Sequence, residues 1–454
     1  MIGKYIFFVV FSLFLITASD PFFGIESLWT PVPKEESSDV RERPWMSTEI
    51  FRKYLEDHDN LVDDAFTVTP YYYPSVNFWF LIYTQFPSTS VVIHDKSNLN
   101  IIYKVLDFSS LHDKKLPRNT LYILQNKLSD EKVNSLKDEL DDLIKDPFSL
   151  SLSAKRIYRT LQQANVALPI NKMERKDFFK SLKKNLRSQT GQKDFIRAGV
   201  VRSLPYQKFL TTYFSSKKLP KELLAIPFLE SSFNPRAHSR VNALGAWQFM
   251  PLIGSYFVPK RTRHYDYRSN VGVSSVAAAF LMSQNYRIMK SWDLAVTAYN
   301  SGTKHLLRTK RELASDVINL EAVIKHSDSE IFGFASKNFY SEFLALAHVL
   351  AYQERLYADL HQSDRKDIDQ NLRFFMAKCS IRQDKDLTSS EREDIEFHND
   401  HIPDSKFRFP RGFIVTTKGE LNKKRFFEVP TSSLVKLMPK DWSRLIARQS
   451  CSTR

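Results

Sequence analysis

The spacing of apolar residues changes several times along this chain of 454 residues, and each spacing predicts a different element. From Val76 to Phe108, aromatic and β-branched residues are interrupted by the turn-forming stretches Pro-Ser-Thr and Asp-Lys-Ser-Asn. This pattern predicts two or three strands. At 127–146 and again at 152–166, apolar residues recur at helical spacing. Helices are therefore expected to follow the strands.

The segment 171–189 also has a helical period, with Phe178, Phe179, Leu182 and Leu186 near one side and basic residues elsewhere. Two interpretations of its basic side stay open. It is either a solvated face that covers the domain behind it, or a face that binds a cell wall or a membrane surface.

Helix signals dominate from Leu204 to Tyr357, in KELLAIPFLESS, SSVAAAFLMSQNYRIM, DLAVTAYNS and KNFYSEFLALAHVLAYQERLY. A charged stretch after Leu360 marks a boundary, and 407–421 predicts a short strand or extended segment beyond it. The expected class is therefore α+β. The expected regions are an N-terminal accessory region at 20–195 with strands then helices, a mostly helical domain at 196–360, and a small C-terminal module at 361–454.

The first nineteen residues predict a secretory signal peptide. Lys4 precedes an uncharged apolar run from Tyr5 to Ile16, and small residues end the segment at Ser19. The run is too short to span a bilayer comfortably, so cleavage after Ser19 is expected, with an uncleaved anchor as the alternative. No later stretch of the sequence is long and apolar enough to predict a transmembrane helix.

Composition narrows the classes of partner. The chain is 43% hydrophobic, which excludes a disordered protein, and carries a net charge of +15, which implies attraction to polyanions. Because the chain is predicted to be exported, an anionic wall or membrane surface is favoured and nucleic acid is not expected. The oligomeric state stays unknown.

Two cysteines, Cys379 and Cys451, exclude a disulfide-rich scaffold and a multi-cysteine metal site. Whether they pair with each other stays open. The eleven histidines show no metal-binding pattern, and none of the glycines forms a phosphate-binding or dinucleotide-binding motif. The sequence therefore predicts no metal and no cofactor.

Glu230 is the strongest candidate for chemistry. It ends an apolar helical run and is crowded by Ile226, Phe228, Leu229 and Phe233. Losing its proton would leave a charge in poorly hydrated surroundings, so its pKa should be raised. Glu230 is therefore a candidate general acid.

Three short words follow in a fixed order: Glu230-Ser231, then Gly-Ala-Trp-Gln ending at Gln248, then Ala-Tyr-Asn-Ser-Gly ending at Gly302. Each alone occurs by chance, but the ordered set resembles the catalytic domain of the soluble lytic transglycosylases. It is most similar to the membrane-bound murein transglycosylase D group, over about 204–357. The segment 333–347, GFASKNFYSEFLALA, resembles the last helix of that group's motif set.

The resemblance implies a lysozyme-like (goose-type) helical domain that cleaves peptidoglycan in the periplasm or cell envelope of a diderm bacterium. It implies that Glu230 protonates the bond between N-acetylmuramic acid and N-acetylglucosamine. The same group would then take a proton from the muramyl C6 hydroxyl, which closes a 1,6-anhydro ring. A window without acidic residues, 231–265, agrees with a mechanism that uses one carboxyl, whereas most glycosidases use two.

Two rival functions stay open. One is a muramidase-type hydrolase on the same fold, which would use water and an added acid such as Asp266 or Asp293. The other is a wall-binding scaffold without catalysis. The group's common LysM repeats find no convincing copy at 361–454.

Further residues match the family's substrate-binding words or chemistry. The amide of Gln248 offers a donor and an acceptor, which suits N-acetyl groups. For Ser239, Asn300 and Trp247, the respective alternatives are a turn serine, a structural support and a core aromatic. Tyr267 departs from the family's Asp-Glu-Arg word, which should affect only local packing. The predicted substrate-binding residues are Ser231, Ser239, Trp247, Gln248, Tyr299, Asn300 and Tyr340.

Overall fold

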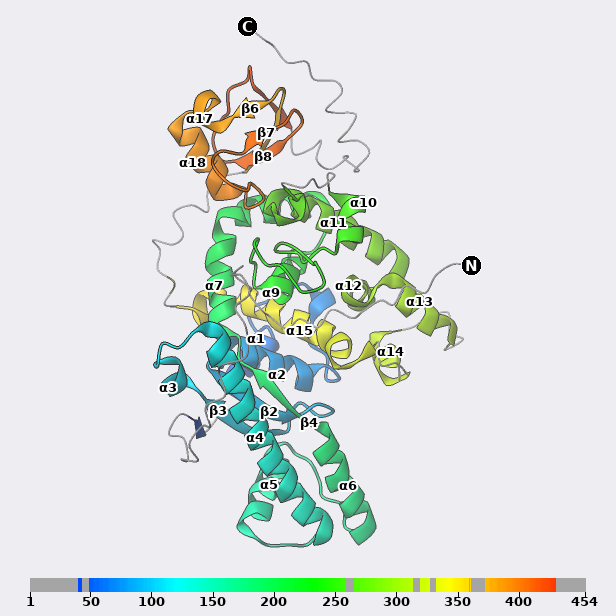
Figure 1. The fold of residues 1–454 in the computed structure, drawn as a ribbon. Helices are drawn as coiled ribbons and strands as arrows, with labels where there is room; N and C mark the ends of the chain where they lie inside the picture. Colours follow the sequence, from blue (N-terminus) through cyan, green and yellow to red (C-terminus); the bar gives the residue numbers. More distant parts are fainter. Residues whose placement is uncertain are drawn as a thin grey trace, which may run out of the picture. The chain divides into compact units, whose positions relative to one another are not determined.

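The computed structural model describes residues 40–42, 49–258, 265–312, 319–326, 332–358, 360 and 372–429. Figure 1 shows the chain as a ribbon. The predicted signal peptide and Cys451 lie outside the described residues, so cleavage and cysteine pairing stay predictions. The chain divides into two compact units after Phe195, and the later unit also takes in Leu61–Phe66. We call them the N-terminal and the C-terminal unit. The fold is α+β, as predicted.

An antiparallel sheet forms the base of the N-terminal unit, with strand order β1-β3-β2-β4. Its central strands are almost fully buried, which fits their run of β-branched residues. The last strand comes from the end of the segment that was predicted to be wholly helical. The strands are β1 (Arg41–Glu42), β2 (Ser90–Asp95), β3 (Ile102–Asp107) and β4 (Leu186–Thr190).

The start of the region in which strands were predicted is a helix. Two strands are found between Val76 and Phe108, but Val76–Thr84 belongs to helix α2, whose side chains are buried on every side. A helix that is apolar all round has no amphipathic period, so its pattern cannot be told from that of a buried strand. Pro74 in the first turn favours the helix start. The helices are α1 (Glu49–Leu55), α2 (Tyr73–Thr84), α3 (Ser109–His112), α4 (Arg118–Lys145), α5 (Leu152–Gln163) and α6 (Lys172–Asn185).

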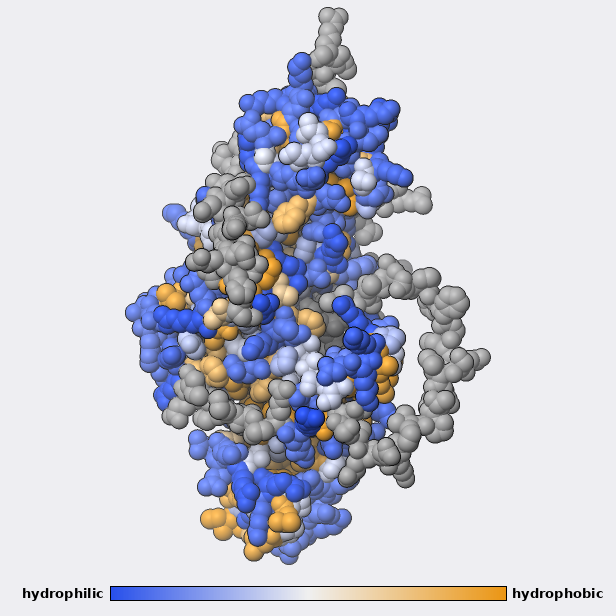
Figure 2. All heavy atoms as spheres, turned by 90° about the vertical axis from the view of Figure 1, so that its left-hand side faces the viewer, coloured by the Kyte–Doolittle hydropathy of each residue, from blue (hydrophilic) through white to orange (hydrophobic). Residues whose placement is uncertain are grey.

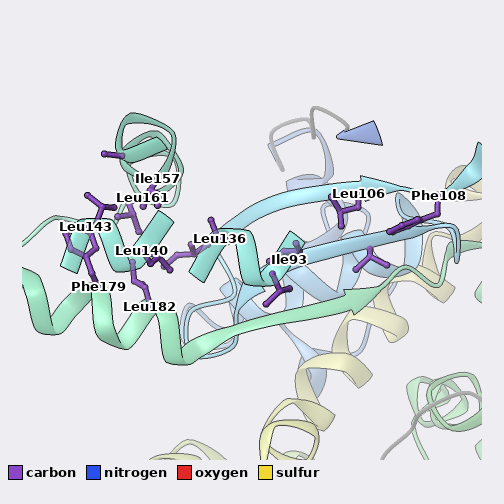
Figure 3. Close-up of a cluster of buried hydrophobic side chains, with 14 of the residues drawn as sticks. Ile93, Leu106, Phe108, Leu136, Leu140, Leu143, Ile157, Leu161, Phe179 and Leu182 are labelled. Atoms are coloured by element: carbon purple, nitrogen blue, oxygen red, sulfur yellow. The ribbon is translucent and has the colours of Figure 1, made fainter. Parts of the chain in front are cut away.

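Helices α4, α5 and α6 share one apolar core with the sheet. Figure 3 shows side chains from all three helices meeting at one end of the cluster, and Ile93, Leu106 and Phe108 at the sheet end. Leu140, Leu161 and Phe179 are completely buried in it. The predicted helices at 127–146 and 152–166 are thus confirmed, and they form a stem whose far end projects beyond the sheet.

The C-terminal unit is mostly helical between residues 196 and 357, as predicted. Its core includes Phe66 from the remote segment η1 (Asp64–Phe66), which contacts Phe343 and Trp292 at ring distances of 5.4 and 6.2 Å. The elements are α7 (Lys193–Ser203), η2 (Leu204–Tyr206), α8 (Gln207–Ser216), η3 (Lys221–Ala225), α9 (Ile226–Ser231), α10 (Pro251–Phe257), η4 (Tyr267–Ser269), α11 (Val271–Met289), α12 (Trp292–Ser301), α13 (Thr303–Glu312), α14 (Leu320–His326), α15 (Phe334–Ala351) and α16 (Gln353–Leu356).

A small module of strands and short helices follows in the same unit. It has a sheet of order β8-β5-β9 and a two-stranded ribbon, β6-β7. The prediction of a short strand at 407–421 is confirmed by β8. The elements are β5 (Arg373–Ala377), β6 (Ile381–Arg382), α17 (Gln383–Asp386), α18 (Ser389–His398), β7 (Arg408–Phe409), β8 (Ile414–Thr417) and β9 (Phe426–Val429).

Buried hydrogen bonds join this module to the start of α11. The hydroxyl of Tyr267 accepts the backbone N–H of Ile414 at 2.9 Å. The amide nitrogen of Asn270 donates to Asn399 Oδ1 at 3.0 Å and to Thr416 Oγ1 at 3.1 Å, while its oxygen caps α11. Tyr267, predicted to matter only for local packing, thus docks the C-terminal module.

None of the helices in the described part of the chain is long and apolar enough to cross a membrane.

Replacing Asn270 with alanine should loosen β8 as well as the start of α11. The substitution removes a helix cap and leaves buried partners unsatisfied, a cost of about 2–4 kcal/mol. Hydrogen exchange at the β8 amides should accelerate in Asn270→Ala. Asn171→Ala is the matched control, because Asn171 caps α6 at an exposed position and should cost about 1 kcal/mol. Unchanged β8 exchange in Asn270→Ala would contradict the docking role.

Candidate active site

Glu230 lies at the end of a short, buried helix. Helix α9 stops because Ser232 and Phe233 adopt positive φ angles of 49° and 56°. Their carbonyl groups accept hydrogen bonds from the Arg202 guanidinium, at 2.5 Å for Ser232 and 3.3 Å for Phe233. This anchor fixes the direction of the chain directly after Glu230. The carboxyl is therefore presented from a rigid backbone.

The pKa of Glu230 is raised to about 8, first by burial and second by the charge of Glu342. Burial penalises the charged form, and a second carboxylate nearby penalises it further. Glu342 belongs to α15, which packs against α9. The residue itself is only half-buried, so part of its surface stays open to solvent. A group that keeps its proton at neutral pH and remains accessible is suited to donate that proton.

Tyr299 lies beside the carboxyl. Its pKa is raised well above the ordinary value, first by burial and then by the charge of Glu230. Its hydroxyl donates a 2.6 Å hydrogen bond to the backbone carbonyl of Trp247. Tyr299 therefore links helix α12 to the loop that carries Gln248. It lies next to the Glu230 carboxyl and also holds the loop that carries Gln248.

Gln248 has a positive φ of 46° and is half-buried. Its amide nitrogen donates to the carbonyl groups of Gly245 at 2.8 Å and Ala237 at 3.1 Å. Because both neighbouring groups are carbonyl acceptors, the amide must turn its nitrogen, and not its oxygen, toward them. Both N–H donors thus hold the loop, and the amide oxygen is the group left for a ligand. From the sequence, both the donor and the acceptor of this amide were expected to bind the substrate.

A buried arginine holds the same loop at both ends. Arg268 is 3% exposed; it pairs with Asp266 and donates to the carbonyl groups of Asn242 at 2.7 Å and Phe249 at 2.6 Å. Gly245 has a φ of +83°, and a Cβ there would stand 1.9 Å from the Arg268 carbonyl oxygen. Only glycine fits this close approach to the protein backbone.

Two predicted substrate-binding residues serve the framework instead. Trp247 is fully buried; its indole N–H donates to Ser275 Oγ at 2.8 Å, and its ring stacks on Phe214. The alternative of a core aromatic therefore holds, because a sugar cannot reach a ring with no exposed surface. Ser231 is also buried, and its hydroxyl contacts the carbonyl of Ala246 at 2.8 Å. This hydrogen bond joins α9 to the loop that carries Gln248.

The remaining predicted residues make contacts of their own within the C-terminal unit. Ser239 Oγ accepts the backbone N–H of Ala243 at 2.9 Å within a turn and is half-buried. Asn300 Oδ1 accepts the Ser336 hydroxyl at 3.1 Å, which ties α12 to α15. Tyr340 is buried, and its pKa is raised first by burial and then by the charge of Asp293.

Glu342 and Arg268 were not singled out by the sequence analysis. Glu342 follows Tyr340 by two positions in the segment that resembled the family's last helix, so the single acidic residue of that segment was the available signal. Arg268 belongs to the Asp-Tyr-Arg word, but its contacts depend on tertiary structure. The acids considered for a hydrolase are engaged elsewhere: Asp266 pairs with Arg268, and Asp293 accepts the backbone N–H groups of Leu294 and Leu320.

Comparison with known proteins places this site within a known domain. Residues 215–319 match the family model described as "Transglycosylase SLT domain". This range includes the predicted site residues from Glu230 to Asn300, but neither Tyr340 nor Glu342. The chain therefore carries a lysozyme-like SLT domain, as the resemblance implied.

Three relatives each match about a quarter of the chain. Membrane-bound lytic murein transglycosylase D of Escherichia coli (strain K12) is 35% identical over 117 residues, covering 26% of this chain and 26% of that protein. The protein of the same name from Escherichia coli O6:H1 matches equally. A putative tributyltin chloride resistance protein of Alteromonas sp. (strain M-1) is 36% identical over 108 residues, covering 24% of this chain and 52% of that protein. The match thus spans about a quarter of the first two relatives.

Glu230→Gln should stabilise the folded protein increasingly as pH rises. The unfolded carboxyl has the ordinary pKa of 4.5 and the folded one about 8, so the folded state binds the proton more tightly between these values. Wild-type stability should therefore fall from about pH 4.5 to about pH 8, while glutamine cannot ionise. The difference in free energy of unfolding should reach a few kcal/mol and level off above pH 8. A difference that is independent of pH would contradict the raised pKa.

Glu342→Gln should lower the pKa of Glu230, because it removes the neighbouring negative charge. The pKa should remain above 4.5, since burial, the larger cause, is retained. Titration of the Glu230 carboxyl carbon by NMR would measure the change. An unchanged or higher pKa would show that Glu342 does not act on this carboxyl.

Proposed function

We propose that the protein is an exported peptidoglycan lytic transglycosylase, in which Glu230 is the single acid and base. The observation that carries the proposal is an accessible glutamate whose pKa is raised to about 8, placed within an SLT domain. The substrate would be the β-1,4 bond between N-acetylmuramic acid and N-acetylglucosamine. The product would carry a 1,6-anhydro-muramyl end.

In the first step, Glu230 gives its proton to the glycosidic oxygen, the bond from that oxygen to the muramyl C1 breaks, and positive charge develops at C1. At pH 7 a group with a pKa of about 8 is mostly protonated, so the acid is present in its active form. An ordinary glutamate would be almost fully ionised there. Burial of the carboxyl therefore supports this role directly.

In the second step, the carboxylate accepts the proton of the muramyl C6 hydroxyl while that oxygen bonds to C1. The charged carboxylate is disfavoured by burial and by the charge of Glu342, so reclaiming a proton is favourable. Atoms balance without water, and Glu230 returns to its starting state. The two features that raise its pKa thus support both steps.

The surroundings support a role in holding the sugar chain. The amide oxygen of Gln248 can accept from an N-acetyl N–H group, and Tyr299 borders the carboxyl from α12. Ser239, Asn300 and Tyr340 remain proposed substrate-binding positions on the basis of the family resemblance. Ser231 and Trp247 would act indirectly, by fixing α9 and the loop.

A hydrolase on the same fold is the second candidate, and Glu342 is the observation that favours it. A hydrolase would need a second carboxyl to activate water or to attack C1. Asp266 and Asp293 are engaged in structural contacts, whereas the charge of Glu342 acts on Glu230. In the transglycosylase, Glu342 only tunes the pKa of Glu230.

Digestion of isolated sacculi followed by mass spectrometry of the products would test the proposal. We expect anhydro-muramyl ends from wild type and a loss of at least about 100-fold in rate for Glu230→Gln. Glu222→Gln is the matched control. Glu222 is a buried glutamate eight residues earlier that accepts the backbone N–H of Asp63, a bond that glutamine can also accept.

The outcome for Glu342→Gln separates the candidates. Under the proposal this variant still forms anhydro ends, and the alkaline limb of its pH–rate profile moves to lower pH. Reducing ends from wild type, together with inactivity of Glu342→Gln, would replace the transglycosylase by the hydrolase. No digestion by wild type would leave a wall-binding scaffold, whereas equal digestion by wild type and Glu230→Gln would overturn the role of Glu230.

A further inference from the structure

Five large apolar side chains are exposed together at the far end of the stem formed by α4, α5 and α6. Two turns carry them, and the guanidinium of Arg175 lies 4.8 Å from the Phe148 ring centre and so joins the turns. Figure 2 shows hydrophobic surface gathered at the lower end of the view, with hydrophilic surface around it. The apolar tip consists of Phe148 (47% exposed), Leu150 (71%), Leu152 (79%), Ile170 (92%) and Met173 (74%).

The first turn is held in a shape that points these side chains outward. Phe148, Leu150 and Leu152 alternate with serines. The hydroxyl of Tyr158 reaches the carbonyl oxygens of Ser149 at 3.0 Å and Pro147 at 3.3 Å, and Ser151 caps α5. The backbone is therefore fixed from inside the stem.

The second turn is fixed in the same way. Asn171 caps α6 through the backbone N–H groups of Met173 and Glu174, so Ile170 and Met173 flank a defined helix start. The stem core beneath is closed by Leu143 and Phe179. The apolar tip is thus held outside a core that is already complete, and an exposed apolar cluster of this kind marks an interaction site.

The segment that carries both turns has a surplus of positive charge, in which Lys145, Arg156 and Lys180 pair with Asp142, Glu139 and Asp177. Residues 145–180 contain eight lysines and arginines and three acidic residues, a surplus of five positive charges. Lys145 is the last residue of α4, before the first turn, and Lys172 is the first residue of α6, in the second turn. Basic residues that surround exposed leucine, isoleucine and phenylalanine side chains are typical of segments that enter the interface of an anionic bilayer.

We propose that the apolar tip docks the protein on a membrane of anionic phospholipid, with these side chains inserted at the level of the headgroups. Charge complementarity selects this occupant. A protein partner would need a broad, complementary surface, whereas two turns at the end of a helical stem offer a narrow one. An anionic wall polymer would match the charge but would leave the apolar side chains in water. The site and the proposed chemistry play no part in this inference.

Sedimentation with lipid vesicles would test it, using the protein as recovered after export. Wild type should bind vesicles of equal parts phosphatidylglycerol and phosphatidylethanolamine, and bind phosphatidylcholine vesicles much more weakly. Each buried methylene is worth roughly fourfold in partitioning, so Leu150→Ser with Ile170→Ser should reduce binding by about 100-fold. Lys172→Gln with Lys176→Gln should reduce it by about tenfold at low salt.

Ile123→Ser is the matched control. Ile123 is 64% exposed on the same helix α4, about 33 Å along its axis from Lys145, and its replacement should leave binding unchanged. Leu150→Trp reports insertion directly, because its fluorescence should shift to the blue on anionic vesicles and be quenched by brominated lipid. The double serine variant should digest isolated sacculi as wild type does, so a failure of the enzymatic proposal would be seen separately.

Three outcomes would overturn the inference. The first is wild-type binding that survives Leu150→Ser with Ile170→Ser. The second is a Leu150→Trp emission that does not change on vesicles. The third is a loss of sacculus binding or of self-association in the double variant while vesicle binding is absent throughout, which would assign the apolar tip to a wall polymer or to a second copy of the chain.

Discussion

The shape of the loop that carries Gln248 depends on the hydrogen bonds of the buried Arg268 guanidinium. A charged group with 3% exposure is tolerated only when its donors are satisfied, and here one carboxylate and two backbone carbonyls accept them. Those carbonyls belong to Asn242 and Phe249, so one side chain closes the loop between them. Gly245 then touches the Arg268 backbone, and Gln248 is held in its unusual conformation. The geometry around Glu230 is thus set by residues that need not touch a substrate.

The position of Glu230 lowers the stability of the folded protein. A carboxyl that is buried and close to a second carboxyl makes the folded state less favourable whenever it ionises. Natural proteins accept such conflicts at functional sites, where an altered pKa has a use. Neighbouring residues hold Glu230 in place. The Arg202 guanidinium fixes the end of α9, and the Ser231 hydroxyl joins α9 to the loop that carries Gln248. The positive φ angle of Ser232 adds backbone strain directly after Glu230, as is common at functional sites.

Local words in the sequence were enough to single out Glu230, Gln248 and Tyr299 as candidates, because the chemistry proposed for each depends on residue type and spacing. The helical character of residues 204–357 followed from periodicity. What failed was Val76–Thr84, where burial on every side of α2 erased the period that distinguishes helix from strand. Trp247 could not be resolved between sugar platform and core, because an aromatic residue fits either.

The roles that sequence reasoning missed all arise from contacts between distant segments. The charge of Glu342 raises the pKa of Glu230, which lies 112 positions earlier, and the local sequence around either residue gives no sign of the other. Tyr267 replaces a charged residue in a familiar word, and only the docked C-terminal module shows that its hydroxyl accepts the Ile414 N–H group. Patterns of a few residues report local structure; they carry no information about which surfaces meet.

The remote segment at Phe66 has a consequence for how the chain acquires its shape. Phe66 packs on Phe343, 277 positions later, and the larger part of the N-terminal unit, Thr67–Phe195, is encoded between them. The intervening unit has its own core, so it can assemble while the earlier segment waits. Closure of the second core requires α15 to have been synthesised, and such long-range contacts slow folding. Until then the surroundings of Glu230 are incomplete, and the polypeptide emerging from the ribosome holds a carboxyl of ordinary acidity.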